Sequence, residues 1–296
     1  MTTATISQSP LVQRVIASLN DFPMSRAAVI PTVMRLTARS STAPGELARA
    51  IANDPALSAT VLRLSNSSFY GRVRAVSSLK EAVMVLGTAL LRSLIVATSV
   101  SSMFRSKEDE LEDVLWRHSL ATAIGARIIA QRTRVQAEEE VFLAGLVHDL
   151  AQLILLQRFA DEYRPVLTEM QQSWSQQLDI ERDRLGVTHE DIGAIILEQW
   201  NFPPQLTALV RNHHDPEAPA EPSGENVDES VRRMRHVVYC ADVLADSLGY
   251  GFSSDLDIMQ ALQPSAEYLG LALESLPEIS EELTTRVTEE QELFKS

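Results

Sequence analysis

The sequence has little of several residue types, and each scarcity excludes a class of protein. Its 296 residues include one cysteine, 11 glycines and 5% aromatic residues. The single cysteine, Cys240, excludes an intramolecular disulfide framework and is typical of a reducing compartment, so we expect a cytoplasmic protein. The first residues lack a basic segment followed by an apolar run, which argues against a signal peptide. Charges or histidines interrupt each long apolar run before about 18 residues, so we expect a soluble protein without a transmembrane span.

The same composition predicts an all-α fold. Alanine and leucine are plentiful, glycine is scarce, and runs of alternating β-branched residues are rare. The length allows two lobes with a substantial core. The charge-rich segment 105–110 is the predicted boundary between an N-terminal helical lobe, residues 1–105, and a second helical lobe with an acidic tail, residues 106–296.

Charge is distributed unevenly between these two parts of the chain. The net charge is −14; residues 1–105 contain 11 Lys or Arg and 4 Asp or Glu, whereas residues 106–296 contain 15 and 36. The asymmetry fits lobes that attract each other or bind different partners, and it also fits ordinary solvated helix faces. The overall acidity argues against nucleic-acid binding. The basic first lobe could offer a docking surface for an acidic partner domain or a phosphorylated ligand, with Arg63, Arg72, Arg74 and Lys80.

A nearly unbroken apolar run, residues 141–159, contains the adjacent pair His148 and Asp149. Its periodicity predicts one continuous core helix. Burying an imidazole and a carboxylate in such a helix costs free energy unless they are hydrogen-bonded or hold a metal. Other predicted helices cover residues 88–104, 111–133, 188–200 (opened by a capping box of Thr188 and Asp191), 230–248 and a solvated tail from Pro277.

Candidate partners for this pair come from the remaining histidines. All six lie between positions 118 and 236, and five are at helix positions or helix ends. With Asp149 and Asp242 they form a set of imidazoles and carboxylates suited to Fe, Mn or Zn. Each also has an ordinary explanation: a polar residue on an amphipathic helix, an ion pair with Arg, or a favourable interaction with a helix C-terminus. His236 follows three arginines and is predicted to be a surface residue, so the candidate ligands are His118, His148, Asp149, His189, His213, His214 and Asp242.

The order of these residues resembles a known superfamily. His118, then His148-Asp149, then Asp242 is similar to the H…HD…D pattern of HD-domain metal-dependent phosphohydrolases. More closely, the chain resembles the HDOD (HD-related output domain) family in the segments Ile51–Gly71 (I-A-N-D-P-A-L-S-A-T-V-L-R-L-S-N-S-S-F-Y-G), Val76–Gly87 (V-S-S-L-K-E-A-V-M-V-L-G) and Gly145–Leu155 (G-L-V-H-D-L-A-Q-L-I-L). The likeness extends over residues 22–214.

The resemblance implies a two-lobed helical architecture with an HD-like bundle in the C-terminal lobe. It implies that His118, His148, Asp149 and Asp242 bind one divalent metal, Fe, Mn or Zn. His189, His213 and His214 fall where HD-GYP phosphodiesterases place ligands for a second ion. Asp149, His213 and His214 are then the candidate catalytic residues.

The sequence departs from active HD-GYP enzymes at two points. The family motif H-D-I-G-K is H-D-L-A-Q here, so Gln152 replaces a lysine that handles substrate phosphate. His213-His214-Asp215 is followed by Pro216, and the G-Y-P loop is absent. We therefore predict a non-catalytic bacterial signalling module that binds a divalent metal or a nucleotide, and whose partners are signalling proteins or a small nucleotide ligand. The alternative is a metal-dependent phosphohydrolase acting on cyclic dinucleotides or other phosphoesters. The sequence leaves the oligomeric state open.

Overall fold

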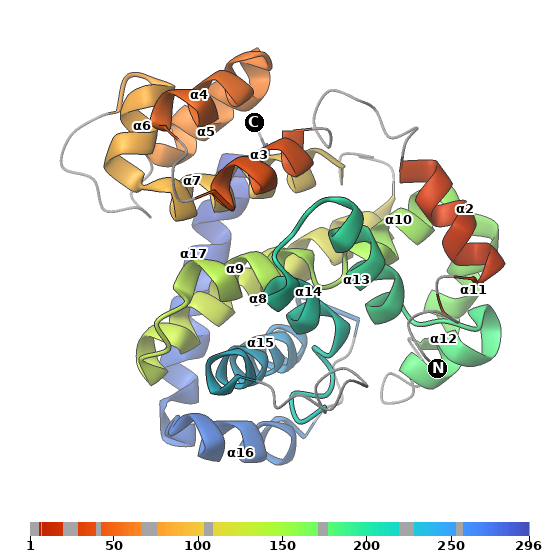
Figure 1. Ribbon diagram of the computed structural model, residues 1–296. Helices are drawn as coiled ribbons and strands as arrows, with labels where there is room; N and C mark the ends of the chain where they lie inside the picture. The colour runs from red at the N-terminus through yellow and green to blue at the C-terminus, as the bar shows by residue number, and fades with distance from the viewer. Residues whose placement is uncertain are drawn as a thin grey trace.

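The computed structural model is helical throughout the residues it describes, which are 6, 8–19, 29–39, 43–66, 76–103, 109–170, 177–218, 228–252 and 257–295 (Figure 1). No strand occurs within those ranges, so the predicted all-α fold is confirmed. The helices are α2 (Pro10–Leu19), α3 (Val29–Thr37), α4 (Pro44–Ala52), α5 (Pro55–Ser65), α6 (Leu79–Leu86), α7 (Thr88–Met103), α8 (Glu110–Thr133), α9 (Glu138–Val147), α10 (Leu150–Arg158), α11 (Ala160–Met170), α12 (Gln177–Leu185), α13 (His189–Gln199), α14 (Pro204–Arg211), α15 (Glu229–Ser247), α16 (Ile258–Leu269), the short 3₁₀ helix η3 (Leu273–Ser275) and α17 (Leu276–Lys295).

Helix α8 is the centre of the molecule and packs against both α9 and α15. Small residues let these helices approach closely. A Cβ placed on Gly145 of α9 would lie 3.0 Å from backbone atoms of Ala123 and Thr122 in α8. On the other side of α8, a Cβ on Gly125 would lie 3.4 Å from the Cβ of Ala241 in α15. Backbone-to-backbone packing of this kind fixes the distances between side chains on the three helices.

The N-terminal helices α3 to α7 surround a smaller core, separate in its packing from the main one. Asp54 and Ser78 cap α5 and α6 with their side chains, and Gly87 ends α6 at a φ of +80°, a conformation that favours glycine. Helix α7 contributes Leu91 and Ile95 to the smaller core. The opposite face of α7 belongs to the main core, so this helix joins the two.

Helix α2 lies beside α10 and α11, on the far side of the main core from α4 to α6 (Figure 1). Arg14 donates two hydrogen bonds to the Glu162 carboxylate, at 2.7 and 3.1 Å, and its guanidinium stacks 4.7 Å from the centre of the Phe159 ring. The start of the chain thus packs on helices beyond the predicted lobe boundary. That boundary, at residues 105 and 106, lies outside the described residues and stays a prediction.

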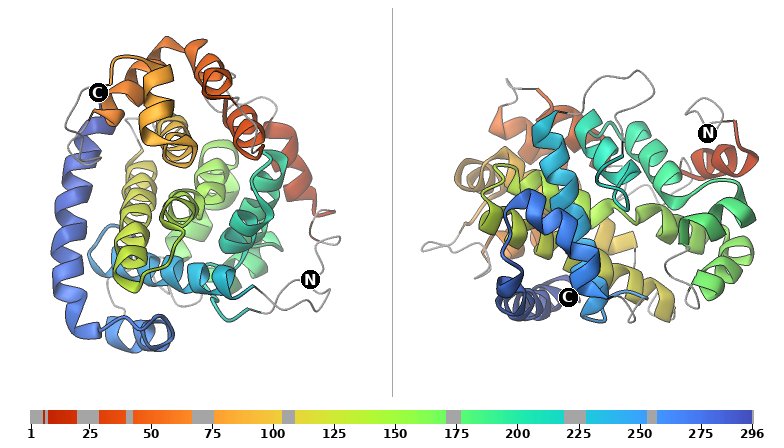
Figure 2. Two further views of the ribbon diagram at one scale, coloured as in Figure 1. Left: turned by 60° about the vertical axis from the view of Figure 1, so that its left-hand side comes forward. Right: turned by 90° about the horizontal axis from the view of Figure 1, so that it is seen from below.

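The acidic tail is less solvated than its composition suggests. Helix α17 runs along α8 on one side of the molecule and reaches α5 with its C-terminal end (Figure 2). Its apolar residues Ile279, Leu283 and Val287 recur every four positions and are buried. The prediction of a solvated terminal helix is therefore wrong for one face. The sequence reading also missed α16, whose helical interior contains Pro264.

No helix among the described residues combines the length and the apolar window that a bilayer crossing requires.

The close contact at Gly145 predicts an unusual response to substitution. Alanine normally favours a helix over glycine by up to about 1 kcal/mol. In Gly145→Ala the new methyl group would press on the α8 backbone, so we expect a loss of about 1–3 kcal/mol in the free energy of unfolding, measured by urea denaturation. Gly45→Ala is the matched control, because its Cβ would meet nothing within 4 Å, and it should stabilise. Equal effects at the two positions would contradict the close approach.

The buried Glu290 of α17 predicts a pH dependence of stability. Burial raises its pKa to about 7 from 4.5, although Arg127 and Arg286 oppose the shift. The folded state then binds this proton more tightly than the unfolded state, so wild-type stability falls as pH rises from about 4.5 to 7. Glu290→Gln removes the effect and should stabilise by up to about 3 kcal/mol at pH 8 and little at pH 5. The exposed neighbour Glu289, changed to Gln, should show no such pH-dependent gain in urea unfolding.

Candidate metal centre

His148 and Asp149 form a turn between two helices. Helix α9 ends at Val147 and α10 begins at Leu150, so the predicted continuous helix over residues 141–159 is wrong. Asp149 has φ −100° and ψ 12°, and its carbonyl accepts from the Gln152 N–H at 2.9 Å, three residues ahead. Neighbouring residues of a regular helix point about 100° apart. The turn instead brings His148 Nε2 within 3.3 Å of Asp149 Oδ2, so that both side chains reach one site.

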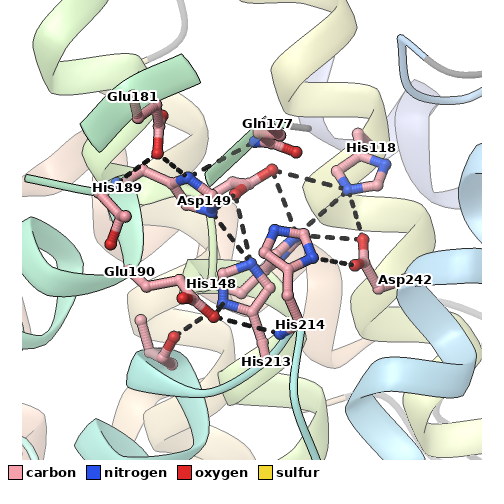
Figure 3. Close-up of polar contacts among 12 residues, drawn as sticks. His118, His148, Asp149, Gln177, Glu181, His189, Glu190, His213, His214 and Asp242 are labelled. Carbon is pink, nitrogen blue, oxygen red and sulfur yellow. Dashed lines mark hydrogen bonds and ion pairs between the residues drawn. The ribbon is translucent and has the colours of Figure 1, made fainter. Parts of the chain in front are cut away.

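A first group of candidate ligands forms where α8, the turn and α15 meet (Figure 3). His118 Nε2 lies 3.1 Å from His148 Nε2 and 2.9 Å from Asp242 Oδ1. His148 Nε2 lies 3.5 Å from the same Asp242 oxygen. All three side chains are buried. The close packing of α8 with α9 and α15 holds these groups together.

A second group lies where α13 begins and α14 ends. The predicted capping box of Thr188 and Asp191 is present and places His189 at the first position of α13. His189 Nε2 lies 3.2 Å from His213 Nε2, and the His213 and His214 ring centres are 4.1 Å apart. The structure thus gathers His189, His213 and His214 into a compact imidazole cluster.

Asp149 links the two groups, with one oxygen facing each (Figure 3). Its Oδ2 lies 3.3 Å from His148 Nε2 and 3.7 Å from His118 Nε2. Its Oδ1 lies 3.4 Å from His189 Nε2 and 3.8 Å from His213 Nε2. Within the described residues, Oδ1 is buried without a hydrogen-bond partner. All seven predicted ligands therefore converge on one site, with Asp149 between its halves.

Hydrogen bonds at the outer nitrogens orient three of the imidazoles. The Nδ1–H of His148 donates to the Gly145 carbonyl and that of His213 to the Val210 carbonyl, both at 2.7 Å. Because a carbonyl oxygen only accepts, each Nδ1 carries the proton. His189 Nδ1 donates to Glu181 at 2.7 Å in the same way. When neutral, each of these rings directs an Nε2 lone pair at the centre of the site.

Such an arrangement fits a metal ion. Lone pairs about 3 Å apart repel one another unless a proton or a cation lies between them, and neutral imidazole Nε2 is a common metal ligand. Three overlapping groups of side chains offer ligand atoms within 4.8 Å of one another: His118, His148 and Asp149; His148, His213 and Asp242; and His189, His213 and His214. The donors are imidazoles and carboxylates, which suit Fe, Mn or Zn. The outer hydrogen bonds resemble those that orient metal-binding histidines in general.

Charge within the site separates the protonation states of its members. Burial opposes protonation of His148, but the carboxylates of Asp149 and Asp242 together outweigh it and raise the pKa of this imidazole well above its usual value. Burial likewise opposes ionisation of Asp149, yet His148 and His189 lower the pKa of that carboxyl well below its usual range. Burial and the neighbouring imidazoles lower the pKa of His213 well below that of free histidine. Asp149 is thus held as a carboxylate and His213 as a neutral ring.

The sequence reading missed three acidic residues that surround the ligands. Glu181 is fully buried and accepts from the backbone N–H of His189 at 2.8 Å and from the Tyr163 hydroxyl at 3.0 Å. Glu190 accepts from the backbone N–H of His214 at 3.2 Å, and burial raises its pKa to about 7. The third, Asp246, lies one helical turn beyond Asp242 on α15. Spacing relative to a ligand could have indicated Glu190 and Asp246, whereas only the fold brings Glu181 to the site.

Other predicted positions are placed as follows. Gln152 is buried in α10, and within the described residues the Nε2 and Oε1 atoms of its side chain lack hydrogen-bond partners. His236 is 1% exposed and hydrogen-bonds Ser265 of α16 at 2.9 Å, so the prediction of a surface residue is wrong. Helix α16, which was not predicted from the sequence, covers it. Lys80 is exposed and Arg63 half-buried, while Arg72 and Arg74 lie outside the described residues.

Comparison with known proteins places this geometry in a family. A curated protein of uncharacterised role from Treponema pallidum (strain Nichols) is 28% identical over 179 residues, which cover 58% of this chain and only 34% of that protein. The chain thus spans about a third of this relative's length. A solved structure of a provisionally named phosphohydrolase from Shewanella amazonensis SB2B has a TM-score of 0.69, at 21% identity over 95% of this chain and 97% of that one.

A third relative is a provisionally named signal transduction protein from Marinobacter aquaeolei VT8, with a TM-score of 0.70 and 23% identity over 91% of this chain and 59% of that chain. At these identities the two solved structures establish the fold alone. The family model of the HDOD domain matches residues 24–216, well over half of the chain. The resemblance in the sequence is thereby confirmed, and the chain belongs to the HDOD domain family.

Proposed function

We propose that this HDOD chain is a non-catalytic bacterial signalling module whose HD-like site binds two divalent metal ions. The observation that carries the proposal is the convergence of imidazole Nε2 atoms on the two oxygens of Asp149. His118, His148 and Asp242 would hold one ion, and His189, His213 and His214 the other. Bound ions would join α8, the turn, α13, the end of α14 and α15, and so set the geometry of the lobe.

A metal ion suits the site better than a nucleotide does. The side chains of His118, His148, Asp149 and Asp242 are between 0 and 7% exposed, and His214 is the most open at 23%. A nucleotide needs a cavity that admits its base and sugar.

The single cysteine supports our further proposal that the protein acts in the cytoplasm.

Metal content tests the proposal. After anaerobic loading with Fe²⁺, Mn²⁺ or Zn²⁺ and desalting, elemental analysis should find about two ions per chain for the best of the three metals. Asp149→Ala should lose both ions because its carboxylate faces both groups, whereas His118→Ala should lose one. His236→Ala is the control and should retain both. A wild-type protein that binds none of the three metals would refute the metal centre.

The absence of turnover is a separate part of the proposal. Gln152 stands where the resemblance expects a phosphate-handling lysine, and it is neutral and buried. Each hydrogen bond and ion pair described above for the candidate ligands joins them to imidazoles, carboxylates or backbone groups, so none of them brings a lysine or arginine to a phosphoryl group. Names of structural relatives point both ways, to a phosphohydrolase and to a signal transduction protein.

The metal-loaded protein should therefore show no hydrolysis of a phosphodiester panel that includes cyclic dinucleotides, assayed by chromatography at protein concentrations comparable to those of substrate. An active HD-GYP enzyme in the same buffer serves as the positive control. Metal-dependent hydrolysis that His148→Ala abolishes would instead establish the alternative, a metal-dependent phosphohydrolase.

That alternative is favoured by the complete, bridged ligand set. A bound ion would then activate water and polarise a phosphoryl oxygen. Asp149, His213 and His214 would be the catalytic candidates, and His214 is the most open of the ligand candidates. The turnover assay separates the two functions without requiring a partner protein.

A partner surface is also part of the proposal. On α6, Lys80 is exposed beside the exposed apolar residues Met84 (61%) and Val85 (41%). We propose that this face, together with Arg63 and with Arg72 and Arg74, contacts an acidic protein segment. A fluorescent polyglutamate peptide should bind the wild type with an affinity that falls as salt rises.

Lys80→Glu should weaken the binding of this peptide several-fold. Arg182→Glu on α12 is the control, because Arg182 is exposed and lies far along the chain in the other group of helices. Equal losses in the two variants would show that net charge alone governs the interaction.

A further inference from the structure

Asp246 faces His118, the candidate ligand of the first group whose outer nitrogen has no hydrogen-bond partner among the described residues. It lies four residues after Asp242 on α15, so both carboxylates point from the same helix face toward α8. Asp246 Oδ1 lies 3.4 Å from His118 Nδ1, on the side of the ring opposite Asp242. Both side chains are buried, and among the described residues neither of these two atoms has a hydrogen-bond partner.

The end of α15 is built to cover this pair. Gly249, at φ +79°, donates its N–H to the Asp246 carbonyl at 2.9 Å, and the Tyr250 N–H reaches the Ala245 carbonyl at 3.1 Å. These two bonds form a Schellman motif, which turns the chain back over the helix end. The turn places Gly251 so close that a Cβ there would lie 1.8 Å from Asp246 Oδ1 and 2.9 Å from His118 Nδ1. A side chain at this position would displace the Asp246 carboxylate.

In the second ligand group, the equivalent hydrogen bond between a carboxylate and the outer nitrogen of a histidine is formed. Glu181, also buried, accepts from His189 Nδ1 at 2.7 Å and leaves His189 Nε2 directed at Asp149. In each half of the site, a buried carboxylate thus lies behind a histidine ring, and the Nε2 of that ring faces the centre. In general, such carboxylates fix the tautomer of a metal-binding histidine and raise its basicity.

We propose that Asp246 is a positioning residue for His118: its carboxylate accepts a hydrogen bond from Nδ1–H, so that the proton stays on Nδ1 and Nε2 is free to bind the ion. In the present geometry His118 Nε2 lies 2.9 Å from Asp242 and can donate a proton to it. A metal ion that binds Nε2 requires the remaining proton to be on Nδ1, where Asp246 is the carboxylate within reach. Gly251 is required because it leaves room for this carboxylate. The inference rests on the proposed metal centre.

Zinc affinity of the full chain, measured by competition with a chelating dye, tests the role of Asp246. Asp246→Ala should weaken binding of one of the two ions about 10–100-fold and leave the other unchanged. Asp246→Asn keeps an acceptor without its charge and should lose less. Gly251→Ala should reproduce the defect by displacing the carboxylate, whereas Ser247→Ala, the matched control on the same helix, should not. Unchanged affinity in both Asp246 variants would overturn the proposal.

A second readout separates failure of this inference from failure of the metal centre. In metal-free wild type, ¹⁵N NMR of the histidine rings should show a form of His118 with its proton on Nδ1, in exchange with the form that donates from Nε2 to Asp242. In Asp246→Ala this proton should be absent and the ring should carry its proton on Nε2, facing Asp242. Identical ring nitrogen shifts in the two proteins would refute Asp246 as the positioning residue. If the ring nitrogen shifts differ between the two proteins as expected but the wild type binds no zinc, only the metal centre is refuted.

Discussion

The organising interaction of this protein is a buried carboxylate held between two groups of imidazoles. Asp149 directs one oxygen at His118 and His148 and the other at His189 and His213. An ionised carboxylate without compensation would be very costly in such a core. The compensation comes from His118 on α8, His148 in the same turn, His189 on α13 and His213 after α14. The relative placement of these segments therefore depends on the charge at one position.

The fold around this carboxylate combines close helix packing with interrupted helices. Gly145 brings α9 against the backbone of α8, and its carbonyl also orients His148. The break after Val147 then turns His148 and Asp149 toward the same point. Local backbone irregularity of this kind is common at functional sites, where regular structure cannot aim neighbouring side chains together.

The proposed metal site would suit a regulatory protein, because bound ions would control how the surrounding helices pack together. Ions that join several helices would couple the lobe's stability to metal supply, since binding to the folded state alone stabilises it. Helix α17 extends from the central helix α8 to α5 in the smaller N-terminal core. Through α5, which packs against α6, a change in the C-terminal helices therefore has a route to the face of α6 with the exposed Lys80.

Much of this protein follows from its sequence alone. Scarce glycine and helical periodicity determined the all-α fold, local capping chemistry at Asp54, Ser78 and Thr188 determined helix starts, and residue order identified the seven ligand candidates and the family. These features depend on short-range contacts or on motifs. Only the tertiary structure decided the rest, namely the helix break at His148, the buried His236 under α16, and the acidic residue Glu181 behind His189. Those depend on which distant segments pack together, and no local pattern encodes that.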